Sequence, residues 1–321
     1  MLPSLKIIIT MKNRIITLVV LISSIFIVDG SAQQDAQYTQ YMYNTMSINP
    51  AYAGSRDALS GLLLHRSQWV GLEGAPRTQT FNLHTPVGYA KKVGLGLSIV
   101  NDKIGPTHET YFDIDFSYTI NTSELGKLSF GLKGGGHLLD VAYSELSQYN
   151  AGDQLLQTDI KNKFSPNVGV GLYYRQSDRW YLGMSVPNLL ETTHFEEASL
   201  SQARERINYY LIGGYVFDLN ADLKLKPAFL LKAVAGAPLQ ADVTANFLLK
   251  EKLTLGLAYR WDAALSGLVG YQFSDGIMVG FAYDRETTDL GKTKFESGSF
   301  EVFLRFEILS EPDKILSPRF F

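Results

Sequence analysis

The chain has 321 residues, of which 45% are hydrophobic and 19% are charged, and its formal net charge is −3. This length suffices for one large domain or two ordinary ones, and the charge leaves no basic stripe that would bind nucleic acid. Since the chain has no cysteine, disulfides and thiolate metal sites are excluded. The 28 glycines, 18 tyrosines and 18 phenylalanines favour β structure with frequent turns and kinks.

Residues 1–32 have the features of a secretory signal peptide. Lys12 and Arg14 supply a positive region, residues 15–28 form a largely apolar run, and the small residues of "GSAQQ" follow. The stretch before Met11 makes the positive region unusually long, so Met11 is an alternative start of the chain. Because the apolar run is shorter than the roughly 20 residues of a spanning helix, a membrane anchor is disfavoured. We therefore expect an exported protein.

A strict alternation of apolar and polar residues marks residues 112–120, which read "FDIDFSYTI". Such alternation predicts a β-strand with one apolar and one polar face. A soluble sandwich would bury the apolar face in a core, whereas an outer-membrane barrel would turn it towards lipid and enclose the polar face. The alternation alone leaves both folds open.

Between residues 57 and 309 the chain has fourteen segments with this alternation or with a β-rich composition. Their typical length is close to the roughly ten residues that a tilted strand needs to cross a bilayer. The segments are 57–69, 77–87, 93–101, 109–120, 126–141, 164–175, 179–187, 206–217, 222–232, 238–249, 252–261, 264–273, 276–284 and 298–309.

The connections between these segments differ in length. Those after even-numbered segments are short, such as "NTSEL" and "RQSDR", whereas the long connections 142–163, 188–205 and 285–297 all follow odd-numbered segments. Outer-membrane barrels have short periplasmic turns and longer outer loops, and an even strand number returns both termini to the periplasm. We therefore predict an all-β fold, a transmembrane antiparallel β-barrel of about 14 strands over residues 57–309, with both termini periplasmic. Its location would be the outer membrane of a Gram-negative cell.

Charged residues within the predicted strands indicate which face is the lumen. An Arg or Lys on the lipid face at mid-membrane costs roughly 2–4 kcal/mol, so these residues are expected to point inward. The predicted lumen charges are Asp113, Asp115, Lys133, Asp242, Arg260, Glu301, Arg305 and Glu307.

Residues 33–56 are not strand-like, and we predict that they form a leader on the periplasmic side of the barrel or a plug within it. In the segment "INPAYAG", Pro50 fixes its own φ and restricts Asn49 to extended geometry, while Gly54 permits a turn. The leader could seal the barrel or serve as a handle for a periplasmic partner, and these alternatives are compatible. The leader residues of interest are Gln40, Tyr41, Asn49, Pro50, Ala51, Tyr52 and Gly54.

A second motif, "RSQWVGLEGAP", lies at the end of the first predicted strand and in the turn after it. One interpretation places Arg66 and Gln68 in a lumen network that fixes the leader. The simpler interpretation, which we prefer, is an interfacial tryptophan, a turn and ordinary lumen polar groups. The residues of this motif are Arg66, Gln68, Trp69, Gly71 and Pro76. The tail, residues 310–321, ends in "PRFF" and is either an assembly signal or a periplasmic contact.

The leader "QDAQYTQYMYNTMSINPAYAGSRD" and the motif "RSQWVGLEGAP" resemble the PorP/SprF family of outer-membrane proteins. Further similar segments follow in order, including "VGVGLYYRQSDRWYLGMSVPNLL" and "LKPAFLLKAVAGAPLQADVTANFLL". The resemblance implies a barrel that works with the type IX secretion and gliding machinery of Bacteroidetes. Its implied partners are outer-membrane lipid, periplasmic ring proteins of that system, and secreted adhesins or other cargo with a C-terminal sorting domain. One departure is Phe300, where the family often has a histidine at the start of the last strand.

No segment of the sequence predicts catalysis. The five histidines are scattered, no pair has the i, i+4 spacing of a metal-binding helix, and no nucleophile is singled out. The segment "GLKGGGH" lacks the full spacing of a phosphate-binding loop. We therefore expect no enzymatic activity, no cofactor and no metal site. The main alternative to a secretion component is a general diffusion porin or solute channel, which requires an open lumen.

Overall fold

The computed structural model describes residues 36–145, 159–190, 207–292 and 297–308. The predicted signal peptide and the C-terminal tail lie outside the described residues. The same holds for residues 146–158, 191–206 and 293–296, which cover parts of the three predicted long connections and residue 206, the predicted start of a strand.

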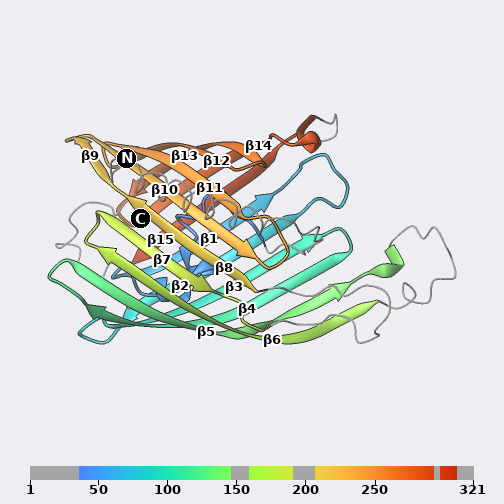
Figure 1. The fold of residues 1–321 in the computed structure, drawn as a ribbon, viewed down its shortest axis with the longest axis horizontal. Helices are drawn as coiled ribbons and strands as arrows, with labels where there is room; N and C mark the ends of the chain where they lie inside the picture. The colour runs from blue at the N-terminus through green and yellow to red at the C-terminus, as the bar shows by residue number, and fades with distance from the viewer. Residues whose placement is uncertain (1–35, 146–158, 191–206, 293–296, 309–321) are drawn as a thin grey trace, which may run out of the picture.

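The described residues form a closed antiparallel β-barrel of 14 strands, drawn in Figure 1. Two of the labelled segments, β8 and β9, share one position in the barrel because both pair with β10. The strands are β1 (Leu59–Ser67), β2 (Arg77–Val87), β3 (Val93–Ile104), β4 (Thr107–Asn121), β5 (Gly126–Val141), β6 (Ile160–Gln176), β7 (Trp180–Val186), β8 (Asn208–Tyr215), β9 (Phe217–Asn220), β10 (Leu223–Val234), β11 (Gln240–Leu249), β12 (Leu253–Arg260), β13 (Ala264–Ser274), β14 (Ile277–Glu286) and β15 (Ser299–Ile308).

With β8 and β9 counted as one strand, each strand pairs with its neighbour in sequence, and β15 pairs with β1 to close the ring. The interruption between β8 and β9 falls at Val216, whose N–H donates to the carbonyl of Arg179, the residue before β7. Closure pairs the edge strands, so that no open sheet edge meets lipid. The fold confirms the prediction of a barrel of about 14 strands, whereas the side of the membrane on which the termini lie stays a prediction.

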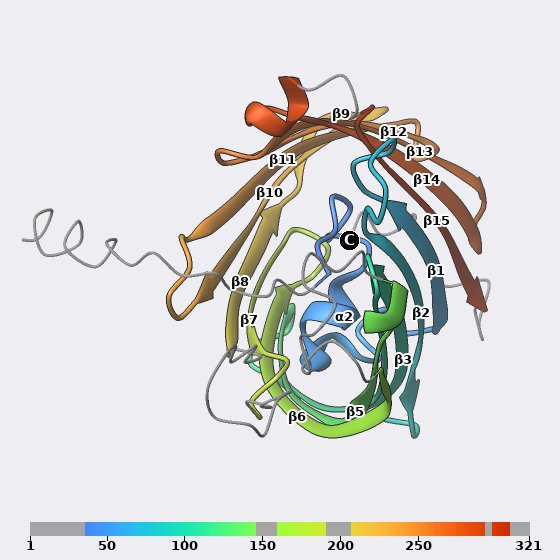
Figure 2. The same cartoon turned by 90° about the vertical axis from the view of Figure 1, so that its right-hand side faces the viewer.

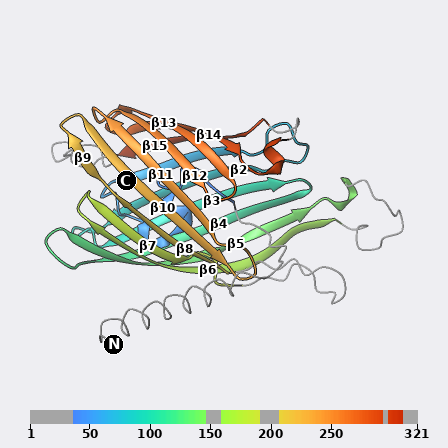
Figure 3. The ribbon, with the colours of Figure 1, turned by 45° about the horizontal axis from the view of Figure 1, so that its top comes forward.

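The alternation in the sequence becomes an inner and an outer face of the barrel. In β4, Asp113 and Asp115 are buried, whereas Phe112, Ile114 and Phe116 are 44%, 65% and 41% exposed on the outside. The successive side chains of a strand point to opposite faces, so one polar and one apolar face result directly from the period of two. The strands run obliquely across the barrel, as Figure 3 shows, and their apolar outer faces form the surface for lipid.

Three consecutive strands are longer than the rest. The strands β4, β5 and β6 contain 15, 16 and 17 residues, and β5 and β6 extend beyond the other strands on the right of Figure 1. At this end of the barrel the two-residue turn between β3 and β4 lies beside the connection from β5 to β6. We call this end the long-loop rim, because the connections β5–β6, β7–β8 and β14–β15 all lie there.

Across the described ranges, no helix is long and apolar enough to cross a membrane.

Candidate functional site

The leader lies inside the barrel. Seen nearly along the barrel in Figure 2, residues 36–58 (blue) run within the ring of strands, with the short helix α2 (Thr45–Ile48) near the centre. A 3-10 turn, η2 (Pro50–Tyr52), follows, and Gln40, Tyr41 and Ala51 are all at most 2% exposed. This arrangement corresponds to the plug alternative of the sequence analysis.

The segment "INPAYAG" attaches the leader to the barrel wall. Asn49 has φ −136° and ψ 110°, the extended geometry expected before a proline, and its Oδ1 accepts a hydrogen bond from the N–H of Ala51 at 3.0 Å. Its Nδ2 donates to the carbonyl of Leu172 in β6 at 2.9 Å. Asn49 therefore caps the turn η2 and also bonds to the strand beside it.

Glycines in the wall make room for this segment. A Cβ at Gly131 in β5 would collide with the backbone of Ala51, and a Cβ at Gly94 in β3 would collide with the carbonyl of Ala53. Gly54 itself has φ +72°, and a Cβ there would lie 2.8 Å from the Cα of Gly94. The close approach of the leader to β3 and β5 therefore requires residues without side chains on both surfaces.

Arg66 is the centre of a buried ionic network that holds the start of the leader. Its Nη1 lies 2.7 Å from Oδ2 of Asp284 and 3.1 Å from Oε2 of Glu301, and it donates to Oγ1 of Thr39 at 2.7 Å. The backbone N–H groups of Thr39 and Gln40 donate to the Glu301 carboxylate at 2.9 and 2.8 Å. Our preferred interpretation of Arg66, an ordinary lumen polar group, is therefore wrong, because Arg66 belongs to a network that binds the leader.

Two further arginines join the leader to the wall at other points. Arg260 pairs with Asp242 and donates through Nη1 to Oε1 of Gln37 at 3.0 Å and through Nη2 to the carbonyl of Tyr38 at 3.2 Å. Near the other end of the leader, the guanidinium of Arg56 donates to both carboxylate oxygens of Glu307 in β15. The leader is thus bound to the wall at separate positions along its length.

Aromatic contacts add to these ionic ones. The ring of Tyr43 packs on Phe303 with a centroid distance of 4.7 Å, and the cationic groups of Lys226 and Arg305 lie 5.4 and 5.7 Å from its centroid. A cation over an aromatic face is attracted by the ring quadrupole. Burial raises the pKa of Tyr38 and of Tyr41 above the ordinary value for tyrosine, so both phenols keep their protons.

The remaining predicted lumen charges lie along β4 and β5. Lys133 Nζ is 3.2 Å from Oδ2 of Asp113, and Asp115, which is fully buried, faces Lys133 across the strand pair. In the described part of the chain, neither oxygen of Asp115 accepts a hydrogen bond. Farther along β4 on the same face, Ser117 donates to the carbonyl of Ala53 in the leader at 2.7 Å.

The rest of the second motif lies at the long-loop rim. Trp69 Nε1 donates to Oε1 of Glu286 at 3.0 Å, and the N–H of Gln68 donates to the carbonyl of Pro76 at 2.9 Å. Gly71 follows with φ +110° in the turn between β1 and β2. The structure therefore separates Arg66, which binds the leader, from its neighbours, which shape the rim.

Sequence reasoning missed several residues that contact the leader. Asp284 could have been found, because it continues the polar register of "GFAYD" in β14. No sequence pattern marks Thr39 as a contact residue. Phe303 points inward but is apolar, so a search for charged lumen residues does not find it. Lys226, which is fully buried, was missed because its strand alternates less clearly. Among the described residues, no three His, Asp or Glu side chains cluster in a way that could hold a metal ion.

A closed barrel with polar side chains inside, an apolar outer belt and an N-terminal segment bound in the lumen defines an outer-membrane barrel protein. The model of the family described as "Type IX secretion system membrane protein PorP/SprF" matches residues 30–306. The chain therefore belongs to this family, as the resemblance of the leader and of the first strand indicated, and it is an outer-membrane protein.

Solved barrels of several kinds are similar to this chain at low sequence identity. The outer membrane protein Omp33 of Acinetobacter baumannii is 8% identical with a TM-score of 0.46, over 78% of this chain and 99% of that one. A Pseudomonas aeruginosa FadL homologue is 12% identical with a TM-score of 0.49, over 82% and 94%. The CymD monoaromatic hydrocarbon channel is 11% identical with a TM-score of 0.47, over 87% and 94%. No curated protein sequence matches the chain.

Proposed function

We propose that this protein, a membrane component of type IX secretion, acts by binding rather than by catalysis. It would assist the export or surface anchoring of cargo with a C-terminal sorting domain and would contact periplasmic ring proteins of the same system. Family membership supports the general role in secretion, and the cargo and the ring contacts are our proposal. The long connections 142–163, 188–205 and 285–297 would face the cargo, and the tight turns would face the periplasm.

The occupied lumen is the observation that carries this proposal. The leader is buried, its hydrogen bonds reach the ion pairs that Arg66 and Arg260 form within the wall, and its own Arg56 pairs with Glu307 of β15. Displacement of the leader would separate Arg56 from Glu307, and removal of one member of a buried ion pair costs roughly 3–5 kcal/mol. A barrel whose lumen holds its own segment is better suited to present binding surfaces than to conduct solutes.

The rival function is a diffusion porin or solute channel, and the charged lumen wall favours it. Single-channel recording in planar bilayers separates the two proposals. We expect the mature protein to show no steady open conductance. A stable conductance of the wild-type protein, comparable to that of a general porin, would favour the channel function.

Affinity purification of the tagged protein from gently solubilised outer membranes tests the secretion role. We expect mass spectrometry to find periplasmic ring proteins or a large sorting-domain cargo that a tagged, unrelated barrel of the same membrane does not retain. A variant with the connection 285–297 replaced by a short Gly-Ser turn should lose cargo but keep the ring proteins. Recovery of the barrel alone, from cells that actively secrete, would contradict the proposal.

A further inference from the structure

The outer face of β1, β2, β3 and β4 becomes polar where it approaches the long-loop rim. The outward row nearest the rim, in which each residue pairs in register with the next, is Ser67, Arg77, Lys103 and His108. The next outward row, two residues further from the rim, is His65, Gln79, Asn101 and Thr110. A basic level and a neutral polar level therefore lie one beneath the other at the edge of the apolar belt.

Elsewhere along this rim the outward side chains are aromatic. On β12, β14 and β15 and in the turn after β12, the exposed residues near the rim are Tyr259, Trp261, Tyr283 and Phe300. Aromatic girdles of this kind are usual where a barrel meets the headgroups of the bilayer. The basic patch replaces the girdle on the side of the barrel that carries β1, β2 and β3, on the right of Figure 2.

Arg77 and Lys103 are exposed, and the described part of the chain does not neutralise them. Neither side chain forms an ion pair with a described residue. Asp140 of β5 lies opposite His108 at the end of the row, and it accepts a hydrogen bond from the N–H of Asn162 at 2.7 Å. Two neighbouring cations on the outer face attract an anionic group.

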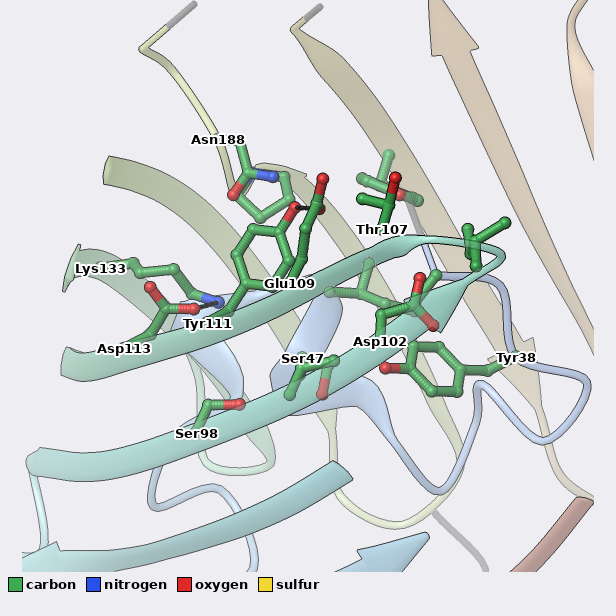
Figure 4. Close-up of a pocket in the computed structure, with 16 residues that line it drawn as sticks. Tyr38, Ser47, Ser98, Asp102, Thr107, Glu109, Tyr111, Asp113, Lys133 and Asn188 are labelled. Carbon is green, nitrogen blue, oxygen red and sulfur yellow. Dashed lines mark hydrogen bonds and ion pairs between the residues drawn. The ribbon is translucent and has the colours of Figure 1, made fainter. Parts of the chain in front are cut away.

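The carboxylates of β1 to β4 all lie on the inner face. Figure 4 shows three of them on the wall of an inner cavity, and the fourth is fully buried; the four are Asp102, Glu109, Asp113 and Asp115. Because successive side chains of a strand point to opposite faces, the sheet itself separates these acidic groups from Arg77 and Lys103. The positive charge of the outer face is therefore available to a ligand in the membrane.

Hydrogen bonds along the sheet hold the neutral row. Gln79 Nε2 lies 3.3 Å from Nδ1 of His65, and Asn101 Nδ2 donates to Oγ1 of Thr110 at 3.0 Å. Asn101 Nδ2 also lies 2.6 Å from Nε2 of His108. Polar groups that bond to one another tolerate the edge of the hydrocarbon region better than unpaired groups do. The row thus forms a stable polar step between the basic level and the apolar surface.

A groove of about 430 Å³ extends from this polar step over the apolar surface. Its polar end is formed by His65, Gln79 and Asn101. Its apolar lining comes from β1, β2, β3 and β15 and includes Leu63, Phe81, Ile99, Val302 and Leu304. The volume lies within the about 300–1,000 Å³ of ligand sites. Since the groove faces the membrane, the acyl chain of a lipid is the group that meets it.

We propose that this outer face binds a phosphorylated lipid of the leaflet beside the long-loop rim. Arg77 and Lys103 would donate to the phosphate, because charge-assisted hydrogen bonds are stronger than neutral ones and a guanidinium forms two of them with one phosphate. One acyl chain would lie in the groove over Leu63 and Phe81. The site does not depend on the secretion role, since it follows from the outer face of the barrel alone.

Native mass spectrometry of the full mature protein in detergent tests this site. The probes are dioleoyl phosphatidic acid, dioleoylglycerol, which has the same chains without the phosphate, and glycerol phosphate, which has the phosphate without the chains. We expect phosphatidic acid to bind at least roughly tenfold more tightly than either of the others, because it alone meets both the cations and the groove. Equally tight binding of dioleoylglycerol or of glycerol phosphate would overturn the proposal.

Two variants connect the binding to this face. The double substitution Arg77→Gln and Lys103→Gln removes the phosphate donors, and Leu63→Trp fills the groove but keeps both cations. Each should weaken the binding of phosphatidic acid by roughly tenfold.

The matched control is the double substitution Lys250→Gln and Lys252→Gln, which removes two exposed cations from the turn between β11 and β12 at the opposite end of the barrel. It should leave the affinity unchanged. A shift in electrophoretic mobility on boiling checks that each variant is a folded barrel. Undiminished binding by the folded variant without Arg77 and Lys103 would contradict the proposal, and this result would not affect the pull-down.

Discussion

At the scale of single residues, the attachment of the leader depends on buried charge. Arg66 compensates both Asp284 and Glu301, and its side chain is 2% exposed. The variant Arg66→Met would leave these two carboxylates buried without a cation, at a cost of about 3–5 kcal/mol. We expect a lower midpoint of urea unfolding in detergent. Arg285→Met, next to Asp284 on the exposed face of β14, is the matched control and should change the midpoint little.

A second residue-scale prediction concerns the glycines of β5. The variant Gly131→Ala places a methyl group where the backbone of Ala51 lies, so the leader must move away from the wall. Gly134→Ala, three residues along the same strand, meets no atom within 4 Å and serves as the control. We expect limited proteolysis to cut the leader faster in the first variant alone. Equal protection of the leader in both variants would show that this contact does not hold it.

At the scale of elements, the leader places a short helix and a 3-10 turn inside the barrel. Deletion of residues 36–56 removes Thr39, Gln40, Arg56 and most of the packing inside the barrel, while every strand keeps its neighbours. We therefore expect a folded barrel that conducts ions in planar bilayers, in contrast to the intact protein. A deletion variant that folds but stays closed would mean that wall side chains alone fill the lumen.

At the scale of the whole molecule, the outer face of the ring forms one continuous apolar belt. Ile114, in the middle of β4, is 65% exposed to the lipid side. The variant Ile114→Arg should destabilise the barrel by about 2–4 kcal/mol, whereas Ile120→Arg near the strand end should cost about 0–1 kcal/mol. Urea unfolding in lipid vesicles measures both. Equal losses of stability in the two variants would contradict a belt centred on the middle of β4.

The sequence by itself determined the strands, their number and their inner faces. In β4 the period of two in "FDIDFSYTI" is a local property of the sequence. Each strand of a barrel meets the same two environments, lumen and lipid. Asp113 could therefore be assigned to the inner face and Phe112 to the outer face without any knowledge of the partner strands. The alternating short and long connections then favoured a barrel over a soluble sandwich.

The tertiary structure alone decided what each inward side chain binds. Arg66 meets Thr39, Asp284 and Glu301, which lie up to 235 positions away in sequence, and no local pattern relates them. The same holds for the fit of Ala51 against Gly131, which depends on the path of the leader through the lumen. Periodicity tells which face a residue occupies, whereas pairing across a closed ring depends on how all the strands and the leader pack together.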